Sequence, residues 1–376
     1  MLAATSGRPR HWRRALVLAA AGVLVAGGGL LAWWTSRPPA FHEPAGVSAL
    51  VREIAHAVPA SLREHDVPGA SVAVVRQGEV RWTGAYGVAD ARTRMPMTPE
   101  TVMQIASVSK PVAAYTVVRL ARAGRVELDA PIERLTAGWR LPESEFDAQE
   151  VTLRRLLSHT AGINVSGYQG LRPGLPLPST EASLAGASGA GKVRIVDAPG
   201  RDWRYSGGGY TLAQLAVERA TGEAYSRVVK RQVLRPLGMA RTGFDCTTSE
   251  FAPRGAASGH DAAGKPMPRF RYAEQAAAGV CSTAGDMGRF AAALMRGPIA
   301  TAMAAPAPAT DGKYGLGLEV ERLRDGTRRL WHDGSNRGWQ AHLEVFPDRD
   351  WALVMLTNGD NGRHVIADVI RLIVRG

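Results

Sequence analysis

The chain has 376 residues, of which 45% are hydrophobic and 21% are charged. This composition supplies enough apolar side chains for one large domain or two modest ones, and it excludes a low-complexity disordered chain. The formal net charge is +12, but the arginines are dispersed and no aromatic-basic stripe accompanies them. We therefore do not expect nucleic acid as a partner.

The N-terminus combines basic residues with an uncharged apolar run over residues 15–34, which closes on Trp33-Trp34. About 20 apolar residues can cross a bilayer as a helix, and the closing tryptophans suit an interfacial anchor better than a cleavage site. Four arginines precede the run: Arg8, Arg10, Arg13 and Arg14. We predict that residues 1–36 form a cytoplasmic tail and a single-pass anchor in the cell inner membrane, with the rest of the chain facing the periplasm or exterior. A cleaved export signal is the alternative.

Residues 37–46 hold repeated prolines, which favour extended backbone, and we predict a linker there before a folded domain over residues 47–376. Both cysteines, Cys246 and Cys281, lie in that domain, where a disulfide and two buried thiols are both compatible with the sequence. The histidines show no ligand spacing such as H-E-x-x-H, so we expect no metal and no cofactor. We interpret His159 as a structural hydrogen-bonding residue.

Strand and helix patterns follow one another along this domain. A hairpin is predicted over residues 70–75 and 79–87, with a tight turn at Gln77-Gly78. Helices are expected over residues 112–123, 153–158, 211–221, 224–234 and 286–295. Strands are expected over residues 316–323, 329–331, 340–346 and 351–356. A final amphipathic helix places four residues on one face: Val365, Val369, Leu372 and Ile373.

Strands at both ends of the domain, with helices between them, predict an α+β fold. Its mostly antiparallel sheet is built from the N- and C-terminal parts, is flanked by helices and carries an inserted helical lobe. Two stretches, residues 165–200 and 301–313, are expected to be irregular because they are rich in Gly, Ala, Ser or Pro. The first of them either shapes substrate access or is a plain surface insertion.

A serine and a lysine three residues apart, Ser107 and Lys110, form the first chemical motif. On a helix this spacing stacks the two side chains on one face. The chain strongly prefers arginine, and only five of its 46 basic residues are lysines. Arginine cannot release its proton in a protein, whereas a desolvated lysine can act as a base near neutral pH. Lysine at position 110 therefore predicts a nucleophile activated by an amine.

Two more motifs follow in order, Tyr205-Ser206-Gly207 and His332-Asp333-Gly334. With Ser107-x-x-Lys110 they resemble the serine β-lactamase and penicillin-binding protein superfamily, and within it the group of class C β-lactamases, DD-peptidases and esterases. Flanking segments share the resemblance over residues 68–75, 156–162, 237–239 and 279–284. The resemblance implies a β-lactamase/transpeptidase-like fold, with the three motifs gathered in a cleft between sheet and lobe.

The resemblance also implies roles for the motif residues. Ser107 would be the nucleophile, Lys110 its activator and Tyr205 a partner acid or base; which of the last two is the base stays open. The backbone N–H groups of Ser107 and Ser335 would form an oxyanion hole beside Gly334.

Two positions depart from the family pattern. Gly207 stands where many members carry an asparagine that holds the substrate amide, so we expect esters, other amides or a differently built pocket. His332 replaces a lysine frequent in β-lactamases, and its side chain would be only partly charged near neutral pH. Arg337 is our candidate for the fixed positive charge that a substrate carboxylate would need.

These residues predict a membrane-anchored serine hydrolase that cleaves amide or ester bonds through an acyl-enzyme on Ser107. The expected substrate is a small molecule or a peptide, with cell-wall peptides among the candidates. The alternative is a non-catalytic, penicillin-binding-like envelope sensor or binding protein. Structural roles are also open, with Tyr205 as a core aromatic and residues 332–334 as a strand-end turn. A Ser-His-Asp hydrolase is disfavoured because the chain has no G-x-S-x-G motif.

Overall fold

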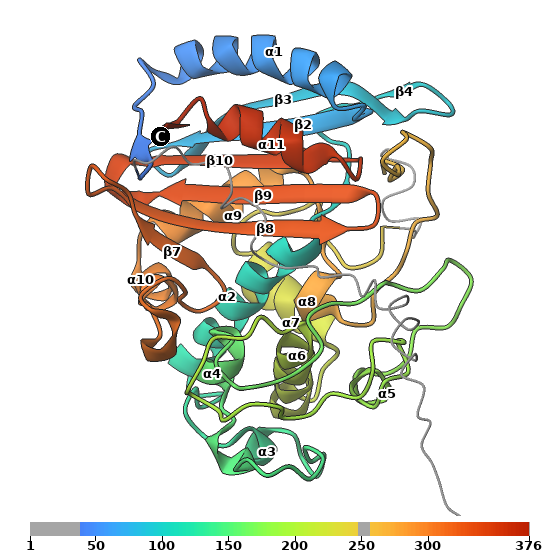
Figure 1. The fold of residues 1–376 in the computed structure, drawn as a ribbon, viewed down its shortest axis with the longest axis vertical. Helices are drawn as coiled ribbons and strands as arrows, with labels where there is room; N and C mark the ends of the chain where they lie inside the picture. Colours follow the sequence, from blue (N-terminus) through green and yellow to red (C-terminus); the bar gives the residue numbers. More distant parts are fainter. Residues whose placement is uncertain (1–37, 247–255, 376) are drawn as a thin grey trace, which may run out of the picture.

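A seven-stranded antiparallel sheet organises the chain in a computed structural model that describes residues 38–246 and 256–375 (Figure 1). Its strand order is β4-β3-β2-β10-β9-β8-β7. The N-terminal strands are β2 (Gly69–Arg76), β3 (Glu79–Asp90) and β4 (Met95–Pro96). The C-terminal strands are β7 (Glu319–Arg322), β8 (Arg328–Asn336), β9 (Trp339–Phe346) and β10 (Trp351–Thr357). The two sets join where β2 pairs with β10, so the predicted split sheet is confirmed.

Helices cover both faces of the sheet, which explains why its central strands are apolar on both sides. One face carries α1 (Val47–Glu64) and α11 (Gly362–Ile370), and the other carries α9 (Ala284–Met295). In β2 the side chains alternate, because successive residues of a strand point to opposite faces. Val72 and Val74 join the core under α1 and α11, whereas Ala73 and Val75 join the core that contains α9.

The helical lobe is inserted between β4 and β7 and lies beside the β7–β8 edge of the sheet (Figure 1). Its helices are α2 (Ser109–Arg122), α3 (Ile132–Leu135), α4 (Leu153–Leu157), α5 (Thr180–Leu184), α6 (Gly207–Thr221), α7 (Tyr225–Val229), the π-helix η3 (Lys230–Leu234), α8 (Gln275–Ala278) and α10 (Pro298–Ala304). Helix α2 packs against α6, α8, α10 and η3 and is buried nearly all round. A helix enclosed in this way holds its side chains in fixed positions.

The structure refines several predicted boundaries. Strand β8 continues to Asn336 and pairs with β9 along its length, so the interpretation of residues 332–334 as a strand-end turn is wrong. Residues 165–200 are largely irregular but include α5, whose first turn is capped by Ser179. The second irregular stretch begins inside α10, where Pro298 occupies the start of the helix, a position that proline favours.

The N-terminal end of the described chain forms a separate two-stranded sheet and packs against the seven-stranded one. Within the predicted linker, β1 (Ala40–Phe41) pairs with β11 (Val374–Arg375), and the ring centroid of Phe41 lies 4.7 Å from that of Phe346. In the described ranges, 38–246 and 256–375, no helix combines the length and the apolar character that crossing a bilayer requires. The predicted tail and anchor, residues 1–36, lie outside these ranges and stay a prediction.

Cys246 and Cys281 form a disulfide, which resolves the alternative left open by the sequence. Cys281 belongs to β6 (Cys281–Ser282), and β6 pairs with β5 (Met103–Gln104). Strand β5 lies just before Ser107 in the chain. The disulfide therefore restrains β6, the strand that pairs with β5 next to the Ser107 turn.

Candidate active site

Ser107 lies in a 3-10 turn, η1 (Ala106–Val108), that leads directly into α2. Ala106 has a φ of 49°, a left-handed conformation that is uncommon for a residue with a side chain. The hydroxyl of Ser109 fixes the turn, because it donates to the Ala106 carbonyl at 2.6 Å and accepts from the Val280 N–H at 3.1 Å. Ser107 itself stays partly exposed. A strained turn, fixed by hydrogen bonds, therefore presents Ser107 at the surface of the lobe.

Lys110 lies under Ser107 and is only 1% exposed. Its Nζ donates to the Ser107 Oγ at 3.0 Å and to the Ala277 carbonyl at 2.9 Å. Within the described residues it has no carboxylate partner, and burial lowers the pKa of its amine to about 7. A substantial fraction of the amine is therefore neutral near pH 7, in hydrogen-bond contact with the serine hydroxyl.

Tyr205 lies immediately before α6 and faces the same lysine. The Lys110 Nζ is 4.8 Å from the centroid of its ring. Although Tyr205 is only partly buried as a residue, desolvation raises the pKa of its phenol well above the ordinary value, and a hydrogen bond with Ser107 acts in the opposite direction. The phenol therefore stays protonated at neutral pH, beside Ser107. This position excludes the interpretation of Tyr205 as a plain core aromatic.

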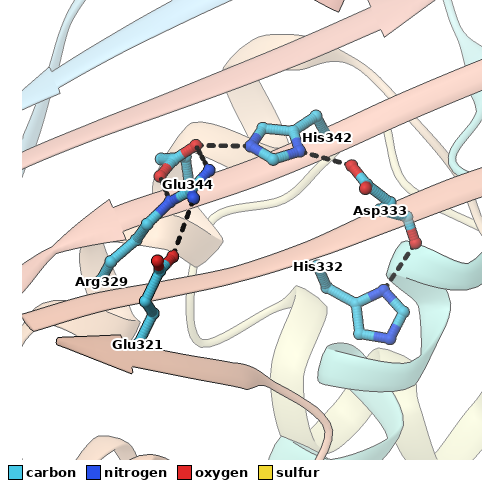
Figure 2. Close-up of polar contacts among 6 residues, drawn as sticks. All are labelled: Glu321, Arg329, His332, Asp333, His342 and Glu344. Carbon is cyan, nitrogen blue, oxygen red and sulfur yellow. Dashed lines mark hydrogen bonds and ion pairs between the residues drawn. The ribbon is translucent and has the colours of Figure 1, made fainter. Parts of the chain in front are cut away.

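His332 lies in β8 with its imidazole buried on the lobe side of the sheet. Its Nδ1 is 2.6 Å from the carbonyl oxygen of Asp333, so Nδ1 carries the proton and Nε2 is left as an acceptor with no partner (Figure 2). Burial and the nearby Lys110 lower the pKa of His332 to about 3. The expectation of a partly charged histidine is therefore wrong, because the imidazole is enclosed and lies next to another base.

Gly334 allows β8 to approach the turn that carries Ser107. A Cβ atom at this position would lie 2.3 Å from the Ile105 carbonyl oxygen and 3.1 Å from the Ser107 backbone nitrogen. Only glycine permits this approach. Ser335 follows on the exposed side, where its Oγ accepts from the Gln340 side chain at 3.0 Å. The contact between Gly334 and the Ser107 turn brings Ser335, the next residue of β8, close to that turn. An oxyanion hole formed by the backbone N–H groups of Ser107 and Ser335 stays a prediction.

Gly207 begins α6 under the first residues of the long irregular segment. Its N–H donates to the Ser166 carbonyl at 3.1 Å, and a Cβ would lie 3.1 Å from that oxygen and 3.3 Å from the Tyr168 ring. Residues 164–168 thus pack on the helix start, where the resemblance would place an asparagine side chain. Arg337 is exposed, and its Cζ lies 4.3 Å from the centroid of the Phe270 ring.

Behind β8, on the face opposite His332, lies a charged network that sequence reasoning missed (Figure 2). Buried Arg329 bonds to Glu321 and Glu344, and Glu344 accepts from His342 at 2.7 Å. His342 in turn bonds to the Asp333 carboxylate at 2.6 Å. The available signal was the strand sequence 340–345, where polar and apolar residues alternate with period two and so predict one polar face.

The network fixes the charges of its members. Burial alone would lower the pKa of His342, but Asp333 and Glu344 outweigh it and raise that pKa to about 9. Burial would raise the pKa of Glu344, but Arg329 and His342 lower it to about 2. Both groups are therefore ionised at neutral pH. Among the described residues, no group of three or more His, Cys, Asp or Glu side chains is placed to hold a metal ion.

The family model described as Beta-lactamase matches residues 47–375. "Esterase EstB" of Burkholderia gladioli is 34% identical over 222 residues, which is 55% of this chain and 54% of that protein. "D-aminopeptidase" of Brucella anthropi is 28% identical over 314 residues, 80% of this chain and 58% of that protein. The chain thus spans little more than half the length of these curated relatives. The solved structure of a D-stereospecific amidohydrolase from Streptomyces sp. is 25% identical, with a TM-score of 0.66, and the match covers 84% of this chain and 97% of that one.

We predict that His342→Ala lowers the free energy of unfolding by about 3 kcal/mol at pH 6, because it leaves Asp333 and Glu344 without a buried cation between them. The folded pKa of His342 is raised above its ordinary value of 6.5. Its stabilisation is therefore complete below about pH 6.5 and is lost as the pH rises through about 9. Denaturant unfolding across this range should show that loss in the wild type and not in the variant.

The matched control for this variant is Glu79→Ala, which breaks the exposed ion pair with Arg81 and should cost less than about 1 kcal/mol. An equal, pH-independent loss in both variants would contradict the network as described.

We predict that Gly334→Ala lowers kcat by on the order of a hundredfold, because the new methyl group must push β8 away from the Ser107 turn. The control is Gly285→Ala in α9, where a Cβ would meet nothing closer than an ordinary contact of 3.4 Å. Steady-state kinetics on an activated ester measures both. Wild-type kcat in Gly334→Ala would show that β8 does not need this approach.

Proposed function

Because the chain belongs to the β-lactamase family, a family of the serine hydrolase type, we propose that it hydrolyses ester or amide bonds through an acyl-enzyme on Ser107. The observation that carries this proposal is the 3.0 Å hydrogen bond between the Ser107 Oγ and a buried Lys110 whose pKa is lowered to about 7. A nucleophile in contact with a base of matched pKa is the arrangement that acyl transfer requires.

In the proposed acylation, neutral Lys110 takes the hydroxyl proton of Ser107 as the Oγ attacks the substrate carbonyl carbon. The N–H groups of Ser107 and Ser335 hold the oxyanion that forms on the carbonyl oxygen. Tyr205 stays protonated beside Ser107, so it suits the donation of a proton to the leaving group as the bond between that group and the carbonyl carbon breaks. Protonated Lys110 then returns a proton to Tyr205 and is neutral again. In deacylation neutral Lys110 takes a proton from water as the water oxygen attacks the acyl carbon. The bond between that carbon and the Ser107 Oγ breaks, Ser107 receives the proton from Lys110, and the acid is released.

The proposed substrates are esters and amides without an essential negative charge beside the reacting carbonyl. His332 is neutral, and Gly207 contributes no amide side chain to the pocket. The names of two relatives, an esterase and a D-aminopeptidase, support acyl groups of this kind. A β-lactam or a cell-wall peptide is a further candidate substrate, because the same machinery does not by itself choose the acyl group.

We also propose that the apolar run over residues 15–34 anchors the enzyme in the inner membrane with its site facing the periplasm or exterior. The support for this is the length of the run and the four arginines that precede it.

We predict that the full-length chain, mixed with a short-chain nitrophenyl ester and quenched within seconds, gains one acyl mass on intact-protein mass spectrometry. Ser107→Ala should gain none and lose at least about a thousandfold in kcat, because it lacks the nucleophile. Lys110→Arg keeps the charge but cannot accept a proton, so it should fall on the order of a hundredfold or more in acylation rate.

Two controls apply to this experiment. The thermal unfolding midpoint of each variant must match the wild type, and the wild-type acylation rate should rise with pH around a midpoint near 7, since only neutral Lys110 is a base. Equal hydrolysis by Ser107→Ala would overturn the role of Ser107 as the nucleophile. A wild type that neither gains the acyl mass nor hydrolyses the ester would overturn the proposed function and leave the non-catalytic alternative.

We predict that Arg337→Ala raises KM about five- to tenfold for an ester that carries a carboxylate and leaves KM unchanged for its neutral analogue, because Arg337 is an exposed cation directly after the end of β8. Arg63→Ala, at an exposed site on α1, is the matched control. The same KM change for both esters would remove Arg337 from substrate recognition.

A further inference from the structure

His159 occupies an unusual backbone position just after α4. Its φ is 61°, in the left-handed region where glycine or asparagine normally ends a helix. The surrounding hydrogen bonds complete that ending, because the His159 N–H donates to the Leu156 carbonyl and the Thr160 N–H donates to the Arg155 carbonyl at 2.8 Å. A buried histidine at a position that favours glycine indicates that the side chain itself is needed.

Two hydrogen bonds tie His159 to the residues on either side of Tyr205. The carbonyl oxygen of His159 accepts from the Arg204 N–H at 2.7 Å. Its imidazole Nδ1 accepts from the Ser206 N–H at 3.0 Å. The backbone before and after Tyr205 is therefore fixed by one residue, which also lies against the tyrosine with its ring centroid 4.4 Å from that of Tyr205.

The tautomer of His159 follows from these contacts. Since Nδ1 accepts a backbone N–H, the ring proton is on Nε2. Burial lowers the pKa of His159 well below its ordinary value, and the nearby Lys110 and His332 lower it further. Aromatic rings from three other places enclose the imidazole: Trp203, Tyr210 and Tyr314. The ring therefore stays neutral, and its Nδ1 stays an acceptor, over the range in which an enzyme works.

Tyr205 needs such a restraint because it lies outside regular secondary structure. The chain enters α6 only at Gly207, and residues 203–206 form no helix or strand. Its phenol must nevertheless lie within hydrogen-bond reach of Ser107 and close to Lys110. A shift of about 1 Å in a catalytic group can cost a hundredfold in rate.

We propose that His159 is a positioning residue that holds the Tyr205 phenol against Ser107 by accepting hydrogen bonds from the N–H groups on both sides of Tyr205. The inference rests on the proposed function, since it assumes that Tyr205 takes part in acyl transfer. His159 does not touch the substrate; it acts only through Tyr205.

Two substitutions separate the acceptor from the backbone conformation. His159→Asn keeps an acceptor oxygen near the place of Nδ1 and tolerates the left-handed backbone. His159→Gly keeps the backbone conformation and the carbonyl that accepts from Arg204, and removes the imidazole that accepts from Ser206. In the full-length enzyme with a nitrophenyl ester, we expect kcat per titrated active site to fall about ten- to a hundredfold in His159→Gly and less than about fivefold in His159→Asn, with KM little changed in both.

The decisive comparison places both substitutions in a Tyr205→Phe background. If His159 acts through the Tyr205 phenol, His159→Gly should cost less than about twofold there, because the group that it positions is already absent. The same fold loss in both backgrounds would show a general structural role and overturn the inference, as would an equal loss in the Asn and Gly variants. An unchanged kcat in Tyr205→Phe alone would overturn the catalytic role of Tyr205, and with it this inference, while leaving the acyl-enzyme on Ser107 intact.

A measurement on the wild type covers the case in which the Gly variant does not fold. Nitrogen-15 spectra of histidine-labelled enzyme, with His159→Asn for assignment, should show a neutral ring with the proton on Nε2 from pH 5 to 9. A proton on Nδ1 would remove the hydrogen bond from Ser206 and overturn the inference.

Discussion

The burial of one lysine is the constraint on which the rest of this site depends. The Lys110 amine is enclosed at the start of α2, with a serine hydroxyl and a peptide carbonyl as its hydrogen-bond partners. A buried ammonium without a carboxylate is costly, so the amine releases its proton near neutral pH. This cost is tolerated because α2 is packed on several sides by other helices of the lobe. The enclosure that lowers the pKa of the lysine also holds its amine under the Ser107 hydroxyl.

The groups around Lys110 are arranged so that none of them restores its charge. His332 and His159 are both neutral, and the Tyr205 phenol is protonated. Three carboxylates, those of Glu321, Asp333 and Glu344, lie behind β8, where Arg329 and His342 bind them (Figure 2). Strand β8 therefore separates this charged network from the neutral side chains that surround Lys110.

Much of this arrangement could be predicted from the sequence. The period-two and helical patterns predicted the split antiparallel sheet, and the lysine at position 110 stood out in a chain that otherwise uses arginine. The charge of His332 could not be predicted, because it depends on burial and on the approach of Lys110, which is distant in sequence. The role of His159 was equally hidden, since its hydrogen bonds to residues 204 and 206 form only when two loops of the lobe meet. Local sequence patterns do not predict interactions between segments that are far apart in the chain.

The most direct test of this account is the titration of Lys110 itself. The chain has five lysines, and the other four are exposed, so lysine labelled with carbon-13 at Cε gives a spectrum that can be followed from pH 5 to 11. We predict that one resonance, absent from Lys110→Arg, titrates with a midpoint near 7, well below the ordinary lysine value of 10.5. A Lys110 resonance that titrates near 10.5 would show that Lys110 is charged at neutral pH and would contradict its proposed role as the base.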